Sequence, residues 1–227
     1  NISPLLFITF HQLYGISYTL LGLLVLVNFC TQLIVDLVFS FYSHKFDISK
    51  TIRVMPVLTI IGLVIYSLMP ALFPGFTYTF LLIGTIIFSA SAGLAEVLTS
   101  PVIAALPSDN PERDMSRAHS VYAWGVTAVV LLSTLYLQVF GRETWYILAL
   151  MWAIIPLIAF ILFMSSDIPE LENPKSTVGG FRGLKNLVLI LCIMCIFLGG
   201  ASENTMTQWC SGFLEAALGI PKLWGDI

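Results

Sequence analysis

Six long apolar stretches constrain the fold of this chain more than any other feature. A helix needs about 20 mainly apolar residues to cross the hydrocarbon core of a bilayer, and each stretch has roughly that length. They run approximately from Tyr18 to Tyr42, Ile52 to Leu72, Tyr78 to Leu106, Ser120 to Phe140, Thr144 to Met164 and Leu187 to Leu214. The pattern predicts an all-α membrane protein with several spanning helices.

The low charge content supports a membrane location. Only 10% of the 227 residues are charged, whereas soluble domains average about a quarter, so a water-facing surface could not be covered. The net charge of −3 leaves no basic face for nucleic acid, and the high hydrophobicity excludes a disordered chain. The lipid bilayer is therefore the expected partner, and no nucleic acid is expected.

Basic residues alternate between successive connections of the apolar stretches. One set of connections holds Lys45, Lys50, Arg53, Arg113, Arg117, Lys175, Arg182 and Lys185, and the other holds Arg142 and Lys222. The more basic side of a membrane protein usually faces the cytoplasm. We therefore expect a multi-pass protein of the cell membrane (plasma or inner membrane), with the first set of connections inside.

The polar interruptions suggest three parts. Residues 1–166 should form an N-terminal transmembrane bundle. In it, Ser3 to Phe10 is too short to span and is expected to be the tail of a truncated first helix, because the chain opens at Asn1. Two prolines and three glycines in Asp167 to Lys185 favour a cytoplasmic linker over 167–186. Residues 187–227 should then begin a second bundle.

Three carboxylates within the stretches need a reason, because a charge is costly inside the bilayer and often marks a transport pathway. Asp36 follows Asn28 and Gln32 at four-residue spacing, so the three share one helix face that lines either a cavity or a structural helix seam. Glu96 follows a run of small residues that allow close helix packing. Burial there would favour its protonated form, which suits either a proton carrier or a permanent hydrogen bond.

The third carboxylate, Glu203, begins a short polar run in the last stretch. Asn204 and Gln208 share a face beside Trp209, an arrangement that suits a polar small ligand and equally suits helix packing. His119 and Tyr122 lie at the start of the fourth stretch, where a titrating group is either a proton relay or an interfacial anchor.

No enzymatic constellation is visible in the sequence. The four cysteines lie in or beside apolar stretches, and the pair Cys192 and Cys195 has no nearby histidine to complete a metal site. Nucleotide-binding and hydrolase motifs are missing from the sequence. We therefore expect no catalytic residue, no metal, no disulfide and no cofactor.

The arrangement resembles the N-terminal part of a major facilitator superfamily transporter. In that family two six-helix halves hold the solute between them. The resemblance implies an N-terminal six-helix bundle with a truncated first helix, followed by the first helix of the second bundle. Three segments are similar to the fucose permease-like sugar:proton symporter branch, namely GLAEVLTSPVIAAL, AHSVYAWG and GASENTMTQWCSGFLE.

The resemblance has one clear departure. The family pattern GxxxDRxGRK would fall near SFYSHKFDISK, where Ser40, His44 and Asp47 replace the first Gly, the Asp and the second Gly. The gating ion pairs associated with that loop are therefore not expected in their usual form, although the loop remains basic.

The resemblance implies secondary active transport, specifically proton-coupled symport of a sugar-like molecule by alternating access. Glu96 falls on the glutamate associated with protonation, with Asp36 and Glu203 as possible assistants. The expected cavity residues are Asn28, Gln32, His119, Tyr122, Asn204, Gln208 and Trp209. Two alternatives stay open: a drug or metabolite exporter of the same family, and a non-transporting membrane receptor or scaffold.

Overall fold

Helices make up nearly all of the structure. The computed structural model describes residues 3–166, 168 and 186–219, and these ranges contain no strand. The α-helices are α1 (Phe7–Tyr14), α2 (Tyr18–Tyr42), α3 (Ile48–Leu72), α4 (Thr77–Ala105), α5 (Pro111–Phe140), α6 (Trp145–Trp152), α7 (Ile154–Ser165) and α8 (Leu187–Leu218). Short 3-10 turns are η1 (Pro4–Leu6), η2 (Ser43–Lys45), η3 (Pro74–Phe76) and η4 (Arg142–Thr144). The predicted all-α class is confirmed.

Six helices in the described ranges are long and apolar enough to cross a bilayer. Their bounds are Tyr18–Tyr42, Ile48–Leu72, Pro74–Ala105, Pro111–Phe140, Arg142–Ser165 and Leu187–Leu218. The predicted number and order of spans are confirmed, so the chain is a multi-pass membrane protein. The linker predicted over 167–186 lies outside the described residues apart from 168 and 186.

Two helix boundaries differ from the apolar pattern for local reasons. Helix α5 begins nine residues before the predicted Ser120, because the Asn110 side chain accepts a hydrogen bond from the Arg113 amide and Pro111 suits the first helical turn. The predicted single span from Thr144 to Met164 divides into α6 and α7 at Ala153. Pro156 has no amide hydrogen for the preceding turn, which accounts for the break.

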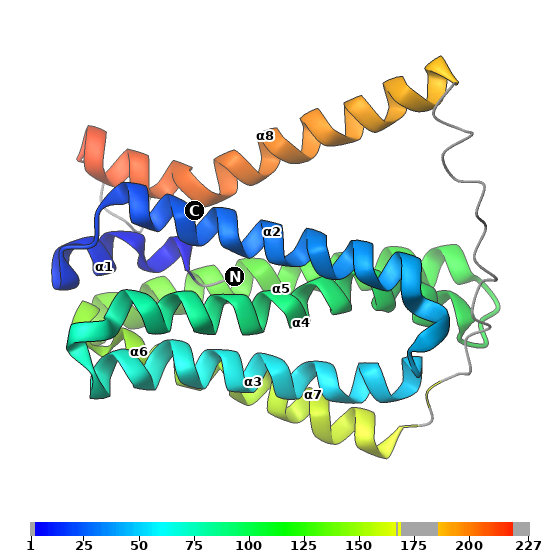
Figure 1. The fold of residues 1–227 in the computed structure, drawn as a ribbon, viewed down its shortest axis with the longest axis horizontal. Coiled ribbons are helices and arrows are strands. Elements are labelled where there is room, and N and C mark those ends of the chain that lie inside the picture. The colour runs from blue at the N-terminus through cyan, green and yellow to red at the C-terminus, as the bar shows by residue number, and fades with distance from the viewer. Residues whose placement is uncertain (1–2, 167, 169–185, 220–227) are drawn as a thin grey trace.

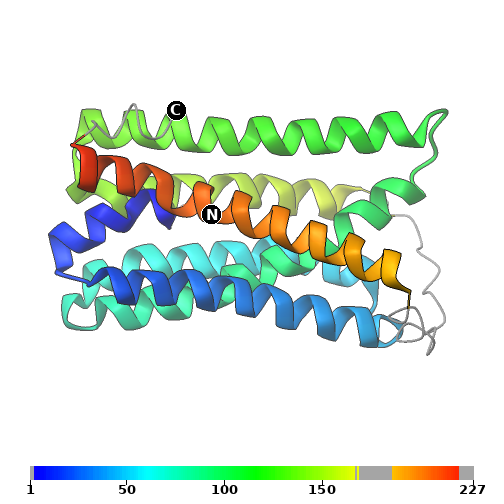
Figure 2. The same cartoon turned by 90° about the horizontal axis from the view of Figure 1, so that it is seen from above.

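Helix α4 lies between α2 and α3 and packs along both, and α3 also packs against α6 and α7. Figures 1 and 2 show the long helices along one common axis, with their connections at two ends. The closest approach is between α3 and α4 at two glycines. A Cβ atom on Gly84 would lie 2.8 Å from the Gly62 carbonyl oxygen, so the backbones touch where neither residue has a side chain.

An aromatic cluster ties α1 to α3 and α6. The Trp145 ring is fully buried and meets the Phe10 ring edge to face at a centroid distance of 4.9 Å. The Trp145 indole N–H donates to the Tyr14 hydroxyl, and the buried Tyr66 hydroxyl donates to Ser3. Burial of these large rings with their polar atoms paired stabilises this end of the bundle.

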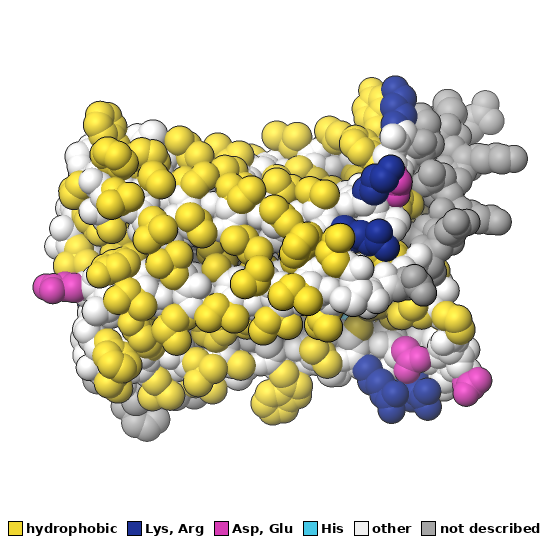
Figure 3. Space-filling view, turned by 90° about the horizontal axis from the view of Figure 1, so that it is seen from below, with side chains coloured by type: hydrophobic (Ala, Val, Ile, Leu, Met, Phe, Trp, Pro, Cys, Tyr) yellow, Lys and Arg dark blue, Asp and Glu magenta, His cyan; other side chains and the backbone are white. Residues whose placement is uncertain are grey.

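Charge divides the two ends of the molecule. We call the end that carries η2 and the start of α5 the basic end, because Lys45, Lys50, Arg53, Arg113 and Arg117 lie there. Figure 3 shows Lys and Arg gathered at this end, beside a wide hydrophobic surface. The opposite end carries Gly15–Ser17, η3 and η4, and Arg142 is its one described Lys or Arg. The structure thus separates the six basic residues that it describes as the alternating sequence pattern predicts.

Helix α8 contacts the rest of the bundle mainly through its second half. Residues 187–207 are exposed apart from the partly exposed Gly200, whereas residues 208–212 are partly buried. Figure 1 shows α8 diverging from α2 toward the basic end and approaching α1 at the opposite end. At the opposite end, α8 is therefore closed against the bundle.

Candidate functional site

The polar stripe of α2 faces α4. Asn28 is buried, and its side-chain oxygen accepts a hydrogen bond from the buried Ser89 hydroxyl at 2.7 Å. One turn further, a Cβ atom on Gly93 would lie 3.1 Å from the Gln32 carbonyl oxygen. Of the two interpretations open from sequence, a cavity lining or a helix seam, this part of the stripe forms a seam.

Asp36 meets α4 one turn before Glu96, at the end of that seam. A Cβ atom on Gly93 would lie 3.1 Å from the Asp36 Oδ1 atom, and Gly93 precedes Glu96 by three residues on α4. The Asp36 Oδ1 atom is buried and has no hydrogen-bond partner among the described residues. Glu96 itself is exposed, contrary to the expectation that it lies among packed helices. The small residues Ser89 and Gly93 make the close contact with α2, and Glu96 lies beyond them toward the basic end.

Gln208 and Trp209 lie where α8 meets the bundle. The Trp209 ring is 5.4 Å from the Phe7 ring, centroid to centroid, and it covers Gly22 of α2 at 3.7 Å from a Cβ position. The Gln208 Oε1 atom is buried without a hydrogen-bond partner in the described part of the chain. An amide oxygen without a hydrogen-bond partner can accept a hydrogen bond from a polar solute.

The other predicted residues lie at exposed positions of α5 and α8. Glu203 and Asn204 are exposed on α8, and the Asn204 amide donates back to the Gly200 carbonyl of its own helix. His119 and Tyr122 are exposed on α5, which packs less extensively against its neighbours than α2, α3 and α4 do. Sequence reasoning places these residues at one cavity, and in the described helices all four side chains are exposed.

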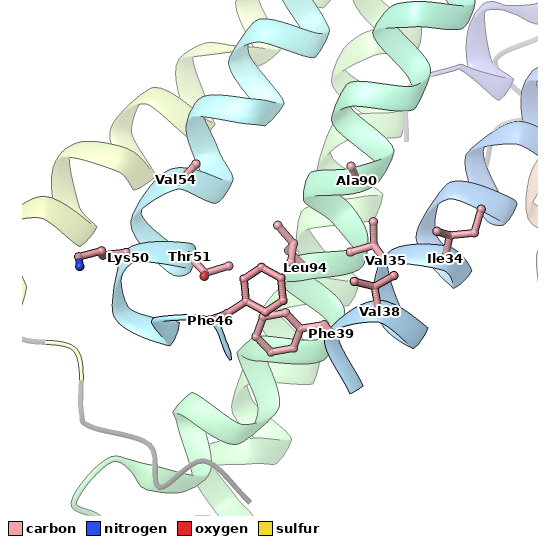
Figure 4. Close-up of a pocket in the computed structure, with 10 residues that line it drawn as sticks. All are labelled: Ile34, Val35, Val38, Phe39, Phe46, Lys50, Thr51, Val54, Ala90 and Leu94. Carbon is pink, nitrogen blue, oxygen red and sulfur yellow. The ribbon is translucent and has the colours of Figure 1, made fainter. Parts of the chain in front are cut away.

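A groove between α2, α3 and α4 holds none of the predicted site residues. It has a volume of about 400 Å³ and is lined by apolar side chains such as Val38, Phe46, Val54 and Leu94. Figure 4 shows the Lys50 side chain turned away from the groove, so the cavity offers almost no polar group. This groove does not suit a polar solute.

The loop before α3 departs from the family pattern and has its own polar contacts. The Asp47 carboxylate accepts a hydrogen bond from the Lys50 amide at 3.1 Å and pairs with the Lys50 ammonium at 3.0 Å. These hydrogen bonds hold the pKa of Asp47 below its ordinary value. Asp47 therefore stays ionised and caps α3.

Sequence reasoning missed a charged group at the opposite end. The Arg142 guanidinium donates to Gln12 Oε1 at 2.9 Å and to Glu215 Oε1 at 2.5 Å. One signal in the sequence could have pointed to Arg142. It is the one Lys or Arg in the connections between spans on its side. Within the described ranges, no group of three His, Cys, Asp or Glu residues could hold a metal ion.

The helices, the two-ended charge distribution and the intramembrane carboxyl groups define a multi-pass membrane protein with polar groups inside its bundle. The chain belongs to the Major Facilitator Superfamily, whose family model matches residues 1–225. Neither a curated protein nor a solved structure matches the chain. Members of this superfamily are transporters, and the protein carries a small solute across a membrane.

Proposed function

We propose that the protein is a proton-coupled sugar symporter that works by alternating access, within the fucose permease-like branch. The observation that carries the proton part is the contact of Asp36 with α4 at Gly93, one turn before Glu96. Two nearby carboxyl groups inside a membrane repel each other when both are ionised, so the pair favours sharing a proton. Glu96 is the main proton carrier, Asp36 its neighbour, and Glu203 a further candidate on α8.

The sugar part rests on Gln208 and Trp209. A sugar offers hydroxyl groups to the unsatisfied Gln208 oxygen and a flat C–H face to an indole ring. Asn204, His119, Tyr122 and Gln32 are the remaining candidates for the cavity. Asn28 acts in this proposal by holding α2 against α4 through Ser89, since its oxygen is already occupied.

Coupling follows from linkage between the two ligands. If a proton on the Asp36 and Glu96 pair raises the affinity for sugar, sugar must raise the affinity for the proton by the same factor. The protein would then accumulate sugar when protons flow down their gradient. In this scheme residues 1–166 and residues from 187 onward form two bundles that rock about the site, joined by a cytoplasmic linker over 167–186.

The test follows internal pH and sugar uptake in vesicles that contain the natural protein. L-fucose, D-galactose and D-glucose are added in turn, with wild type compared with Glu96→Gln and with Glu143→Gln, an exposed acid at the opposite end. We expect sugar-dependent proton entry in wild type and Glu143→Gln. We expect Glu96→Gln to lose proton entry and pH-dependent accumulation while it still exchanges sugar.

Other results would reject parts of the proposal. Unchanged proton-driven uptake in Glu96→Gln would remove Glu96 as the coupling residue. Transport of a hydrophobic dye with no response to any sugar would favour an exporter. Sugar binding without flux would favour a receptor.

A further inference from the structure

The charged group at the opposite end joins three segments that are far apart in sequence. Gln12 belongs to α1, Arg142 to the η4 turn between α5 and α6, and Glu215 to the last turns of α8. Arg142 thus contacts the bundle through Gln12 and contacts α8 through Glu215. No other ion pair among the described residues connects α8 to the bundle.

This ion pair differs from the others in the described ranges. The Lys50–Asp47 and Arg117–Asp114 pairs join residues three positions apart and are largely exposed. The Arg142 and Glu215 side chains are only 28% and 19% exposed. Because water screens a half-buried pair less than an exposed one, its contribution to the closed arrangement is larger.

Glu215 depends on Arg142 in the closed arrangement. Its Oε1 atom accepts from the guanidinium, whereas its Oε2 atom is buried and has no hydrogen-bond partner among the described residues. Without Arg142 the carboxylate would be buried and unpaired, which is costly. If α8 moved away from the bundle, water could solvate Glu215.

The ion pair lies near a second contact of α8 with the bundle. Trp209 packs on Phe7 and Gly22, and Glu215 lies about 1.7 turns nearer the end of the helix. The first half of α8 has no comparable contact and is exposed. A contact that exists in one arrangement and is absent from the other shifts the equilibrium toward the first.

From these contacts we infer that Arg142, held by Gln12, and Glu215 form a latch that keeps α8 closed on the bundle at the opposite end. Opening of that end requires the pair to separate, so the latch sets the balance between the two access states. The inference rests on alternating access in the proposed function, but it does not depend on the identity of the solute or on proton coupling. Arg142 and Glu215 are positioning residues.

The test measures access to a thiol beneath the closed contact. A Cβ atom on Gly22 would meet nothing closer than the Trp209 ring at 3.7 Å, which is ordinary van der Waals contact, so Gly22→Cys introduces a thiol next to that ring. The four free cysteines (Cys30, Cys192, Cys195 and Cys210) are replaced by serine in the full protein, which is then reconstituted in vesicles. Labelling by a water-soluble maleimide is followed by mass spectrometry of the peptide that carries residue 22.

We expect Arg142→Gln and Glu215→Gln each to speed labelling about ten-fold or more, as expected for loss of a charge-assisted hydrogen bond. The double variant should be no faster than the faster single variant, because both remove the same contact. The reversed pair Arg142→Glu with Glu215→Arg should restore slow labelling. Gln12 can still hydrogen-bond to the reversed pair, because its amide N–H₂ group can turn to donate to the new carboxylate.

Matched controls separate the latch from a general effect of charge. Glu143→Gln removes an exposed acid from the same turn, and Arg113→Gln removes a base from an exposed pair at the basic end. Both should label at the wild-type rate. Wild-type rates in Arg142→Gln and Glu215→Gln, or fast labelling that the reversed pair does not correct, would overturn the latch. Neither result bears on the symport proposal, because no sugar or proton gradient is used.

Discussion

A single acidic side chain controls the start of α3 in a pH-dependent way. The ionised Asp47 accepts the Lys50 amide and pairs with its ammonium, and these contacts lower its pKa. A group whose pKa is lowered by folding stabilises the fold above its unfolded pKa of about 3.9. That stabilisation is lost as the pH falls through the lower, folded value.

Asp47→Asn should keep the helix cap of α3 and remove its negative charge. Asparagine caps a helix about as well as aspartate, so the fold is retained but the carboxylate titration is removed. The advantage in thermal unfolding temperature that wild type shows near pH 6 should shrink as the pH falls below about 4. Thermal scans in detergent between pH 3 and 6 measure this, with Asp109→Asn as a control on an exposed acid of the same end. Parallel profiles for wild type and Asp47→Asn would contradict it.

The sequence identified some residues of the candidate site and missed others. Carboxylates inside apolar stretches stand out because the bilayer makes them costly, so Asp36 and Glu96 could be selected. The contact of Asp36 with α4 one turn before Glu96 could not be predicted, because the two carboxylates lie on different helices. Gln12, Arg142 and Glu215 were missed for the same reason, since each is an ordinary polar residue at a span end.

At the scale of helices, the contact between α3 and α4 depends on two glycines. A Cβ atom on Gly84 would lie 2.7 Å from the Tyr66 Cβ and 2.8 Å from the Gly62 carbonyl oxygen, too close for either backbone to remain in place. We expect Gly84→Ala to destabilise the bundle by about 1–3 kcal/mol, the usual range for an overpacked contact.

Thermal unfolding in detergent measures this effect. Gly125→Ala is the matched control, because Gly125 lies within α5 and a Cβ atom there meets nothing within 4 Å. Alanine favours a helix more than glycine does, so the control should keep or raise the unfolding temperature. Equal unfolding temperatures for Gly84→Ala and wild type would show that the helices can separate there at little cost.

For the whole molecule, the separation of basic residues predicts the orientation in the membrane. Lys45, Lys50, Arg53, Arg113 and Arg117 share the basic end, which should face the cytoplasm. Gly75→Cys at the opposite end should label with an impermeant maleimide in intact cells. Asp109→Cys at the basic end should label only after the cells are permeabilised. The reverse pattern would contradict the predicted orientation.

The sequence alone determined the class of fold, the six spans and the division of charge between two ends. These properties depend on the length of each apolar run and on the order of charges along the chain, so no knowledge of contacts is needed. The break between α6 and α7 and the early start of α5 also have local causes, in Pro156 and Asn110.

Only the tertiary structure decided which side chains meet. The Asn28 and Ser89 hydrogen bond joins residues 61 positions apart, and the Arg142 and Glu215 pair joins residues 73 positions apart. Helical periodicity gives the face of each residue but not the neighbour that the face will meet. That neighbour depends on how the helices pack, because packing sets the distance and depth at which two faces approach.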